Sequence, residues 1–118
     1  MKEFAGRVAV ITGAASGIGF GLARRFAQDG MHIVLADIES EPLAIAEAAL
    51  SAMGTTTLAV RTDVTSPEQV ERLAEAAFST FGNVHILCNN AALAAKFSLG
   101  PPAWQLPPRH WPGLPPVT

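Results

Sequence analysis

The sequence predicts an α/β fold with a four-strand parallel sheet in the order 3-2-1-4 and helices on both faces. Residues 1–95 alternate short apolar runs with amphipathic stretches of helical period, which is the pattern of strand–helix–strand units. The connections are short, so each strand is expected to follow the last in parallel through a right-handed crossover. This order forms the first half of a doubly wound sheet, where ligands bind at the carboxyl ends of strands 1 and 4.

Each expected element has a local reason. Strands are expected at residues 7–12, 32–37, 56–61 and 84–89. Helices are expected at about 17–29, 40–53 and 67–81. The strands are short apolar or β-branched runs, as expected of strands covered on both faces. The helices carry apolar stripes at spacings of three and four residues, and Gly30 and Gly54 end the first two.

The helix starts differ in strength. Ser40 is expected to cap the second helix. The third helix has a fuller signal, because Ser66 precedes Pro67 at the first helical position and Gln69 stands three residues after the serine, which is a capping box. The inner face of the first helix is expected to carry Ile18, Leu22 and Phe26, together with Ala23 and Ala27.

Composition excludes several classes of protein. The 118 residues carry a formal net charge of −2, which gives no electrostatic reason to expect nucleic acid or a membrane surface as a partner. The single cysteine excludes an internal disulfide and a multi-cysteine zinc site. No apolar run approaches the roughly 18 residues of a membrane span, and no signal core follows the first charges. We therefore expect a soluble, cytoplasmic protein.

A glycine-rich turn follows the first predicted strand and opens the first predicted helix. It reads Thr12-Gly13-Ala14-Ala15-Ser16-Gly17-Ile18-Gly19. Gly13 permits a tight turn, and Gly17 and Gly19 lack the Cβ that would keep a phosphate away from the backbone. Free N–H groups and the positive end of the helix dipole would then face a pyrophosphate. The pattern predicts a dinucleotide site; the alternative is a tight turn without a ligand.

Asp37 ends the second predicted strand, eighteen residues after Gly19. An acidic side chain there can accept hydrogen bonds from both ribose hydroxyls of an adenosine, and it would repel a 2′-phosphate. No basic residue stands at Ser16 or follows Asp37 to offset that repulsion. We therefore predict NAD over NADP as the cofactor; the alternative is a solvated aspartate at a strand end.

Three motifs in order resemble those of the short-chain dehydrogenases/reductases. Residues 12–19 match the glycine motif of that family, Asp63-Val64 matches the pair after strand 3, and Asn89-Asn90-Ala91 matches the motif after strand 4, with Ala92 in place of its glycine. The resemblance covers residues 5 to about 93 and implies a Rossmann fold.

The resemblance also implies roles for individual residues. Asp63 would hold the adenine amino group with the Val64 backbone beside it, and Ile38 would pack against the adenine. Asn90 would brace strand 4 against strand 1, and residues 91–92 would line the floor near the nicotinamide ribose. The candidate cofactor-binding residues are therefore Gly13, Ser16, Gly17, Ile18, Gly19, Asp37, Ile38, Asp63, Val64, Asn89, Asn90, Ala91 and Ala92.

The chemistry of the family requires a serine and a Tyr-x-x-x-Lys pair. The chain contains no tyrosine, so we expect an NAD-binding half-domain that does not catalyse hydride transfer between nicotinamide and an alcohol or ketone by itself. One alternative is a non-catalytic nucleotide-binding or partner-binding module. A second is a methyltransferase, which also has a glycine-rich loop and an acid after strand 2.

Residues 96–118 differ in composition from residues 1–95. Residues 101–118 hold seven of the nine prolines and both tryptophans, which predicts an irregular segment. A frameshifted, spliced or mispredicted non-family end is one reading. A polyproline ligand at 112–115, or tryptophans that fold back onto the sheet, are the others. An uncovered strand 4 would leave an apolar edge, so we also expect self-association.

Overall fold

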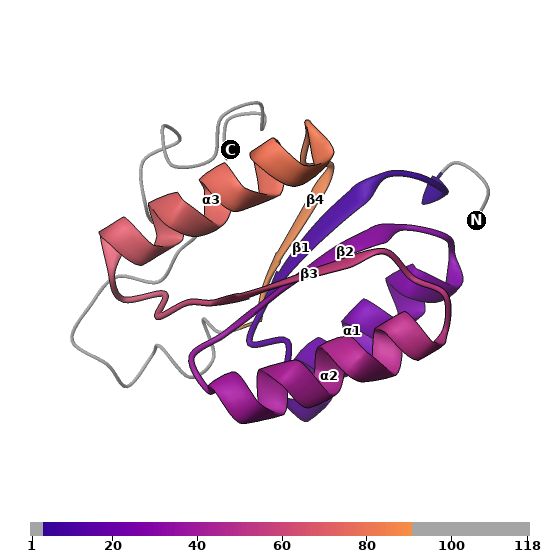
Figure 1. The fold of residues 1–118 in the computed structure, drawn as a ribbon, viewed down its shortest axis with the longest axis horizontal. Coiled ribbons are helices and arrows are strands. Elements are labelled where there is room, and N and C mark those ends of the chain that lie inside the picture. The colour runs from indigo at the N-terminus through magenta and orange to yellow at the C-terminus, as the bar shows by residue number, and fades with distance from the viewer. Residues whose placement is uncertain (1–3, 91–118) are drawn as a thin grey trace.

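The computed structural model describes residues 4–90, so the predicted boundary near Lys96 and the segment 96–118 lie outside the described residues. The chain runs through β1 (Val8–Thr12), α1 (Gly17–Gln28), β2 (His32–Asp37), α2 (Ser40–Ala52), β3 (Thr57–Arg61), α3 (Pro67–Phe81) and β4 (Ile86–Asn89). In this part of the chain the strands form a parallel sheet in the order β3-β2-β1-β4 (Figure 1). The α/β fold and its strand order are therefore confirmed.

Side chains alternate between two apolar cores along the strands. In β1, Val8 and Val10 pack toward α3, whereas Ala9 and Ile11 pack toward α1 and α2. β2 lies in register with β1 and repeats the alternation. All five residues of β1 are buried, which explains its continuous apolar run, because a strand covered on both faces has no solvent side.

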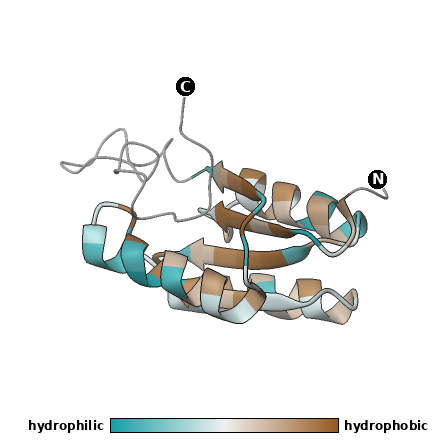
Figure 2. Ribbon diagram, turned by 90° about the horizontal axis from the view of Figure 1, so that it is seen from above, coloured by the Kyte–Doolittle hydropathy of each residue, from teal (hydrophilic) through white to brown (hydrophobic). Residues whose placement is uncertain are grey.

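The helices form a layer on each face of the sheet. α1 and α2 lie together on one face, and α3 lies on the other (Figure 1). Figure 2 shows strongly hydrophobic strands, whereas α3 carries many hydrophilic residues. Because α1 and α2 connect β1 to β3 in one direction and α3 returns the chain to β4 beside β1, the strand order reverses between β1 and β4. A crevice for ligands is expected at the carboxyl ends of those two strands.

The start of α3 is close to the predicted one. Ser66 is the N-cap, and its side chain accepts a hydrogen bond from the N–H of Gln69 at 3.4 Å. Pro67 is the first residue of the helix, as predicted. The capping box is half formed, however, because the Gln69 side chain does not return the bond to Ser66. Its Oε1 instead accepts from the N–H of Asp63 at 2.8 Å.

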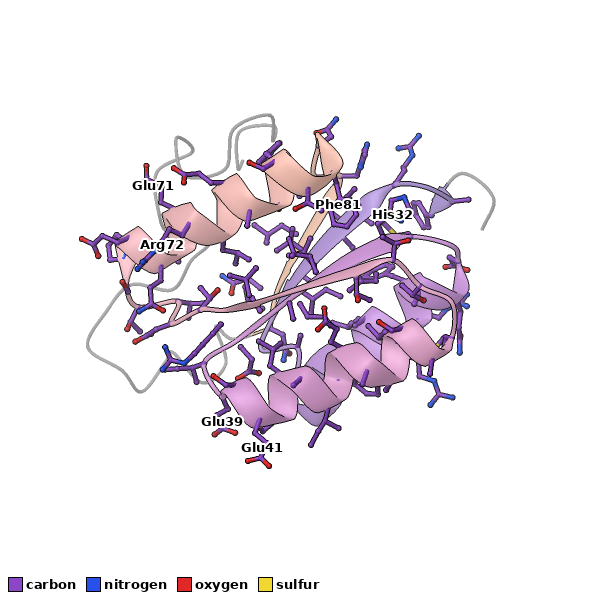
Figure 3. All side chains as sticks on the ribbon, in the orientation of Figure 1. His32, Glu39, Glu41, Glu71, Arg72 and Phe81 are labelled. Atoms are coloured by element: carbon purple, nitrogen blue, oxygen red, sulfur yellow. The ribbon has the colours of Figure 1, made fainter. Side chains whose placement is uncertain are left out.

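The end of α3 is held by a turn and a ring contact. Gly82 adopts a φ of 80°, the left-handed conformation that glycine takes without steric cost, and its N–H bonds to the carbonyl of Phe78. Phe81, the last helical residue, stacks on His32 at the start of β2, with ring centroids 5.3 Å apart (Figure 3). This contact joins the end of α3 to the amino-terminal edge of the sheet.

The start of β4 and the N-cap of α2 differ from those predicted, whereas β1 and β3 begin within one residue of the prediction. β4 begins at Ile86, so Val84 is not a strand residue, although its side chain is buried in the core beneath α3. The N-cap of α2 is Glu39, and no side chain caps that helix. Ser40 is its first helical residue, so the predicted serine cap is wrong.

The predicted inner face of α1 is confirmed for Ala23, which is buried, and for Phe26 and Ala27, which pack against the core beneath α1 and α2, but it is wrong for Ile18 and Leu22. Ile18 is 65% exposed and Leu22 is 36% exposed, whereas Gly19 and Ala23 are buried. Both pairs have the same four-residue spacing, so periodicity alone does not separate them. The small pair faces the sheet because it allows the helix backbone to approach the loop after β1 closely.

Of the two edge strands of the sheet, β3 and β4, β4 is the one predicted to be left uncovered. Among the described strands it pairs only with β1, and its residues are half-buried. The described helices are all too short or too polar to cross a membrane.

Candidate functional site

The loop that connects β1 to α1 lies at the carboxyl ends of the central strands. Its first residue, Gly13, has a φ of 63°, so the backbone turns where a residue with a Cβ would be strained. The N–H of Ala14 bonds to the carbonyl of Ala36 in β2 at 3.1 Å. The turn predicted for Gly13 is therefore confirmed, and the loop is held against the neighbouring strand.

Three hydrogen bonds of this loop converge on the carbonyl oxygen of Gly13. It accepts hydrogen bonds from the N–H of Ser16 at 3.2 Å, from the Ser16 hydroxyl at 2.8 Å, and from Nδ2 of Asn90 at 3.3 Å. Asn90 also contacts Ser16 Oγ at 3.0 Å. The structure thus brings Asn90, from the end of β4, to the loop after β1.

The three glycines of the motif meet different surroundings. A Cβ on Gly19 would lie 2.1 Å from the Gly13 carbonyl oxygen and 2.9 Å from Asn90 Nδ2, so the chain itself requires glycine there. Gly19, a predicted phosphate-approach glycine, is buried, and its Cα faces the loop and not solvent. A Cβ on Gly17 would have no described atom within 4 Å. Gly17, which is exposed, is therefore the glycine that faces open space.

The first turn of α1 has no capping side chain. Ser16 is its N-cap, but the hydroxyl bonds to Gly13 and makes no cap hydrogen bond. The N–H of Phe20 makes the first helical hydrogen bond, to Ser16. The amides of residues 17–19 precede that bond and have no intrahelical acceptor, so they carry the positive end of the helix dipole. An uncapped helix start beside open space at Gly17 fits a phosphate group.

Asp37, at the end of β2, contacts the same loop. Its Oδ2 accepts from the N–H of Ala15 at 3.0 Å, and its Oδ1 accepts from the N–H of Glu39 at 3.2 Å. Each carboxylate oxygen has a second lone pair, so the side chain can still accept from ligand hydroxyls. Ile38 follows it and is 49% exposed. Both residues therefore lie at the ligand edge of the sheet.

The turn after β3 is organised by Asp63. Its Oδ1 accepts from the hydroxyl of Thr65 at 2.6 Å and from the N–H of Thr65 at 2.9 Å. These bonds, and to a smaller extent the nearby Arg61 charge, lower the pKa of Asp63 against the opposing effect of burial. Val64 packs against the core beneath α3. This turn lies after β3, as predicted, and its side chains mainly bond to one another.

Asn89 is the last residue of β4. Its Oδ1 accepts a hydrogen bond from the buried hydroxyl of Thr12 at 2.8 Å, which joins the ends of β4 and β1. Its Nδ2 is buried and has no hydrogen-bond partner among residues 4–90. A buried donor costs free energy unless it forms a hydrogen bond. The Asn89 amide group therefore has a donor available for a polar group at this edge of the sheet.

Sequence reasoning missed one charged residue near the site. Arg61 ends β3, and the parallel register places it directly beside Asp37. Side chains paired in this way lie on the same face of a sheet, and Arg61 is exposed. The predicted preference for NAD rests only on residues near Ser16 and Asp37 in the sequence, and Arg61 is 24 residues after Asp37. The register of two predicted neighbouring strands would have shown this pair.

Ala91 and Ala92 lie outside the described residues. Cys88 is half-buried in the core beneath α1, where burial raises the pKa of its thiol, as expected of a core residue. Within residues 4–90, no group of three or more His, Cys, Asp or Glu side chains could hold a metal ion.

Comparison with known proteins agrees with this geometry. A model of the short chain dehydrogenase family matches residues 7–105. The 1-deoxy-11-beta-hydroxypentalenate dehydrogenase of Streptomyces exfoliatus is 46% identical over 101 residues, which cover 86% of this chain and 36% of the relative.

Two solved structures share the fold. A short chain dehydrogenase/reductase from Burkholderia phymatum in complex with NAD has a TM-score of 0.71 and 49% identity, over 74% of this chain and 31% of that one. L-Sorbose reductase from Gluconobacter frateurii, complexed with NADPH and L-sorbose, has a TM-score of 0.74 and 43% identity, over 77% and 35%.

The chain thus spans about a third of the length of these relatives. The family match extends over most of the chain and includes the whole of the site described above. The relatives share its strand order, and one holds NAD and another NADPH. The chain belongs to the short-chain dehydrogenase/reductase family.

Proposed function

We propose that this chain binds a nicotinamide dinucleotide at the carboxyl edge of its sheet, as the cofactor-binding part of an oxidoreductase. The uncapped first turn of α1 beside open space at Gly17 carries the proposal. The amides of Gly17 and Ile18 would hold the pyrophosphate, and Asp37 would accept from the adenosine ribose. Asp63, Val64 and Ile38 would surround the adenine. The bound nicotinamide would supply or accept a hydride.

The proposed cofactor is NAD in preference to NADP. Asp37, Glu39 and Glu41 place three carboxyl groups within five residues at the turn from β2 to α2, and Figure 3 shows Glu39 and Glu41 at the start of that helix. A 2′-phosphate would be repelled by this charge. Arg61 opposes the effect from β3. Because related structures hold either cofactor, the preference rests on this local balance and not on the family.

We further propose that these 118 residues do not catalyse hydride transfer by themselves. They contain no tyrosine, and within residues 4–90 no histidine lies at the carboxyl edge of the sheet to move the hydroxyl proton. Loss of a positioned acid or base removes roughly 10²–10⁴ in rate. Steady formation of NADH from any alcohol by the purified chain would contradict this proposal.

Calorimetric titration with NAD, NADP and S-adenosylmethionine tests the binding. NAD is expected to bind more tightly than NADP, and S-adenosylmethionine is not expected to bind. Gly17→Ala is expected to weaken NAD binding about tenfold without lowering the free energy of unfolding, because its Cβ enters space that only a ligand would fill. Gly21→Ala, also in open space but one turn further along α1, is the matched control and should bind normally.

Two outcomes would overturn the proposal. If the unaltered chain binds none of the three ligands, the loop is a tight turn without a ligand. If it binds only S-adenosylmethionine, the methyltransferase alternative takes its place.

A further inference from the structure

The carboxylate of Asp37 is bonded to the backbone on two sides. Its Oδ2 accepts from the N–H of Ala15, which lies 22 residues earlier in the chain, and its Oδ1 accepts from the N–H of Glu39 just beyond β2. The first contact reaches into the middle of the glycine-rich loop. A side chain on β2 is thus hydrogen-bonded directly to the loop after β1.

Within that loop, the Ala15 amide is the one held by a distant side chain. The N–H of Ala14 bonds to a backbone carbonyl of β2, and the N–H of Ser16 bonds to the Gly13 carbonyl. Both acceptors are backbone carbonyls, so a side-chain substitution does not remove either of them. The hydrogen bond of the Ala15 amide, by contrast, would be lost with the Asp37 side chain.

We propose that Asp37 is a positioning residue for the phosphate loop as well as an acceptor for the adenosine ribose. The proposal rests on the proposed dinucleotide site and extends it. Under this proposal Asp37, which selects NAD over NADP, is coupled by a hydrogen bond to the backbone that would bind the phosphates. Removal of Asp37 would therefore weaken binding of phosphate groups that never touch its side chain.

Two variants separate this role from the charge of the side chain. Asp37→Ala and Asp37→Asn both remove the negative charge, so both relieve the same repulsion of an anionic ligand. Asn has one carbonyl oxygen, which in the position of Oδ2 can still accept from Ala15 N–H while its NH2 group lies toward the N–H of Glu39, whereas Ala can accept from neither N–H. A difference between the two variants therefore reports the hydrogen bond and not the charge.

The probe is 2′,3′-dideoxyadenosine 5′-diphosphate, which carries a diphosphate but has no ribose hydroxyls for Asp37 to bind. Titrated by calorimetry into the full 118-residue chain, it is expected to bind Asp37→Ala about tenfold more weakly than Asp37→Asn, the cost of one charge-independent anchoring bond and the loosened loop. Equal affinity of the two variants for this ligand would overturn the proposal.

Amide exchange in the ligand-free chain is the second measurement. The Ala15 amide is expected to exchange slowly in the unaltered chain and in Asp37→Asn, and at least tenfold faster in Asp37→Ala. Equal exchange in the two variants also rejects the role. If Asp37→Ala fails to fold by circular dichroism, Asp37→Ser replaces it, because its hydroxyl is too short to reach Ala15.

These results distinguish failure of this inference from failure of the proposed function. If the unaltered chain binds neither NAD nor the dideoxy ligand, the dinucleotide site is wrong, and so is the phosphate role of Asp37 that depends on it. If NAD and the dideoxy ligand bind but Asp37→Ala and Asp37→Asn behave alike, the dinucleotide site holds and the positioning role is rejected.

Discussion

The starts of α1 and α3 have the same N-cap residue and opposite hydrogen bonding. Ser16 and Ser66 both have extended backbone conformations. The Ser66 hydroxyl accepts from the N–H of Gln69 and closes the first turn of α3. The Ser16 hydroxyl donates to the Gly13 carbonyl and leaves the first turn of α1 without a side-chain acceptor. A serine before a helix therefore does not show whether the helix start is closed.

The surroundings of each serine explain the difference. At α3, the N–H of Ser66 bonds to the Asp63 carbonyl, and the Asp63 side chain bonds Thr65, so the turn satisfies its own polar groups. At α1, the Gly13 carbonyl points back beneath the helix and attracts the serine hydroxyl and Asn90. The first turn of α3 is closed by its own N-cap side chain, whereas the first turn of α1 is left open, as the proposed phosphate site requires.

The largest expected effect comes from a substitution that prevents α1 from packing closely against the Gly13 carbonyl. Gly19→Ala places a Cβ against the Gly13 carbonyl and is expected to destabilise the fold by about 3 kcal/mol and to abolish NAD binding. Gly21→Ala lies two residues on in open space and is expected to stabilise by about 0.5–1 kcal/mol. Urea unfolding measures both, and equal stability of the two variants would contradict the packing described here.

A smaller effect compares the two serines directly. Ser66→Ala is expected to lower the free energy of unfolding by about 1 kcal/mol, because it removes a cap. Ser16→Ala removes bonds at an exposed position and is expected to cost about 0.5 kcal/mol or less, with its main effect on NAD affinity. Thermal unfolding with and without NAD separates the two. If Ser16→Ala lowers the free energy of unfolding more than Ser66→Ala does, the description of the α1 start as open and the α3 start as closed is wrong.

The smallest expected effect is a pH dependence of the free energy of unfolding that comes from Asp63, in the turn before α3. Because the folded pKa of Asp63 is lowered below its ordinary value of 3.8, its contribution to stability is fully present above that value and is lost as the pH falls through the folded pKa. Asp63→Asn is expected to reduce the loss of stability between about pH 6 and about pH 2. Urea unfolding across this range measures it, and an unchanged pH profile would show that the Thr65 bonds do not stabilise the ionised form.

The sequence predicts the sheet well because strand order depends on coarse features. Apolar runs, short connections and crossover handedness suffice for β3-β2-β1-β4, and Pro67 and Gly82 mark the limits of α3. The inner face of α1 is predicted in part: Ala23 is buried as expected, but Ile18 is exposed and its neighbour Gly19 is buried in its place. Hydrophobicity favours the isoleucine, whereas close packing on Gly13 requires the glycine.

The site is predicted in part. The motif residues that the structure describes lie at the carboxyl edge of the sheet, because that edge follows from the parallel topology. The bond from Ala15 to Asp37 and the choice made by the Ser16 hydroxyl depend on the path of four loop residues. Residue types alone do not determine that path, since each hydroxyl and carboxylate there has several acceptable partners.

The threefold hydrogen bonding of the Gly13 carbonyl has a spectroscopic consequence. A carbonyl with three donors around it has a weakened C=O bond, and it vibrates at a lower frequency than a carbonyl with one. A carbon-13 label on that single atom would give a band apart from the rest of the amide absorption. Its position would respond to any movement of Ser16 or Asn90, so the chain carries a built-in vibrational reporter of loop geometry.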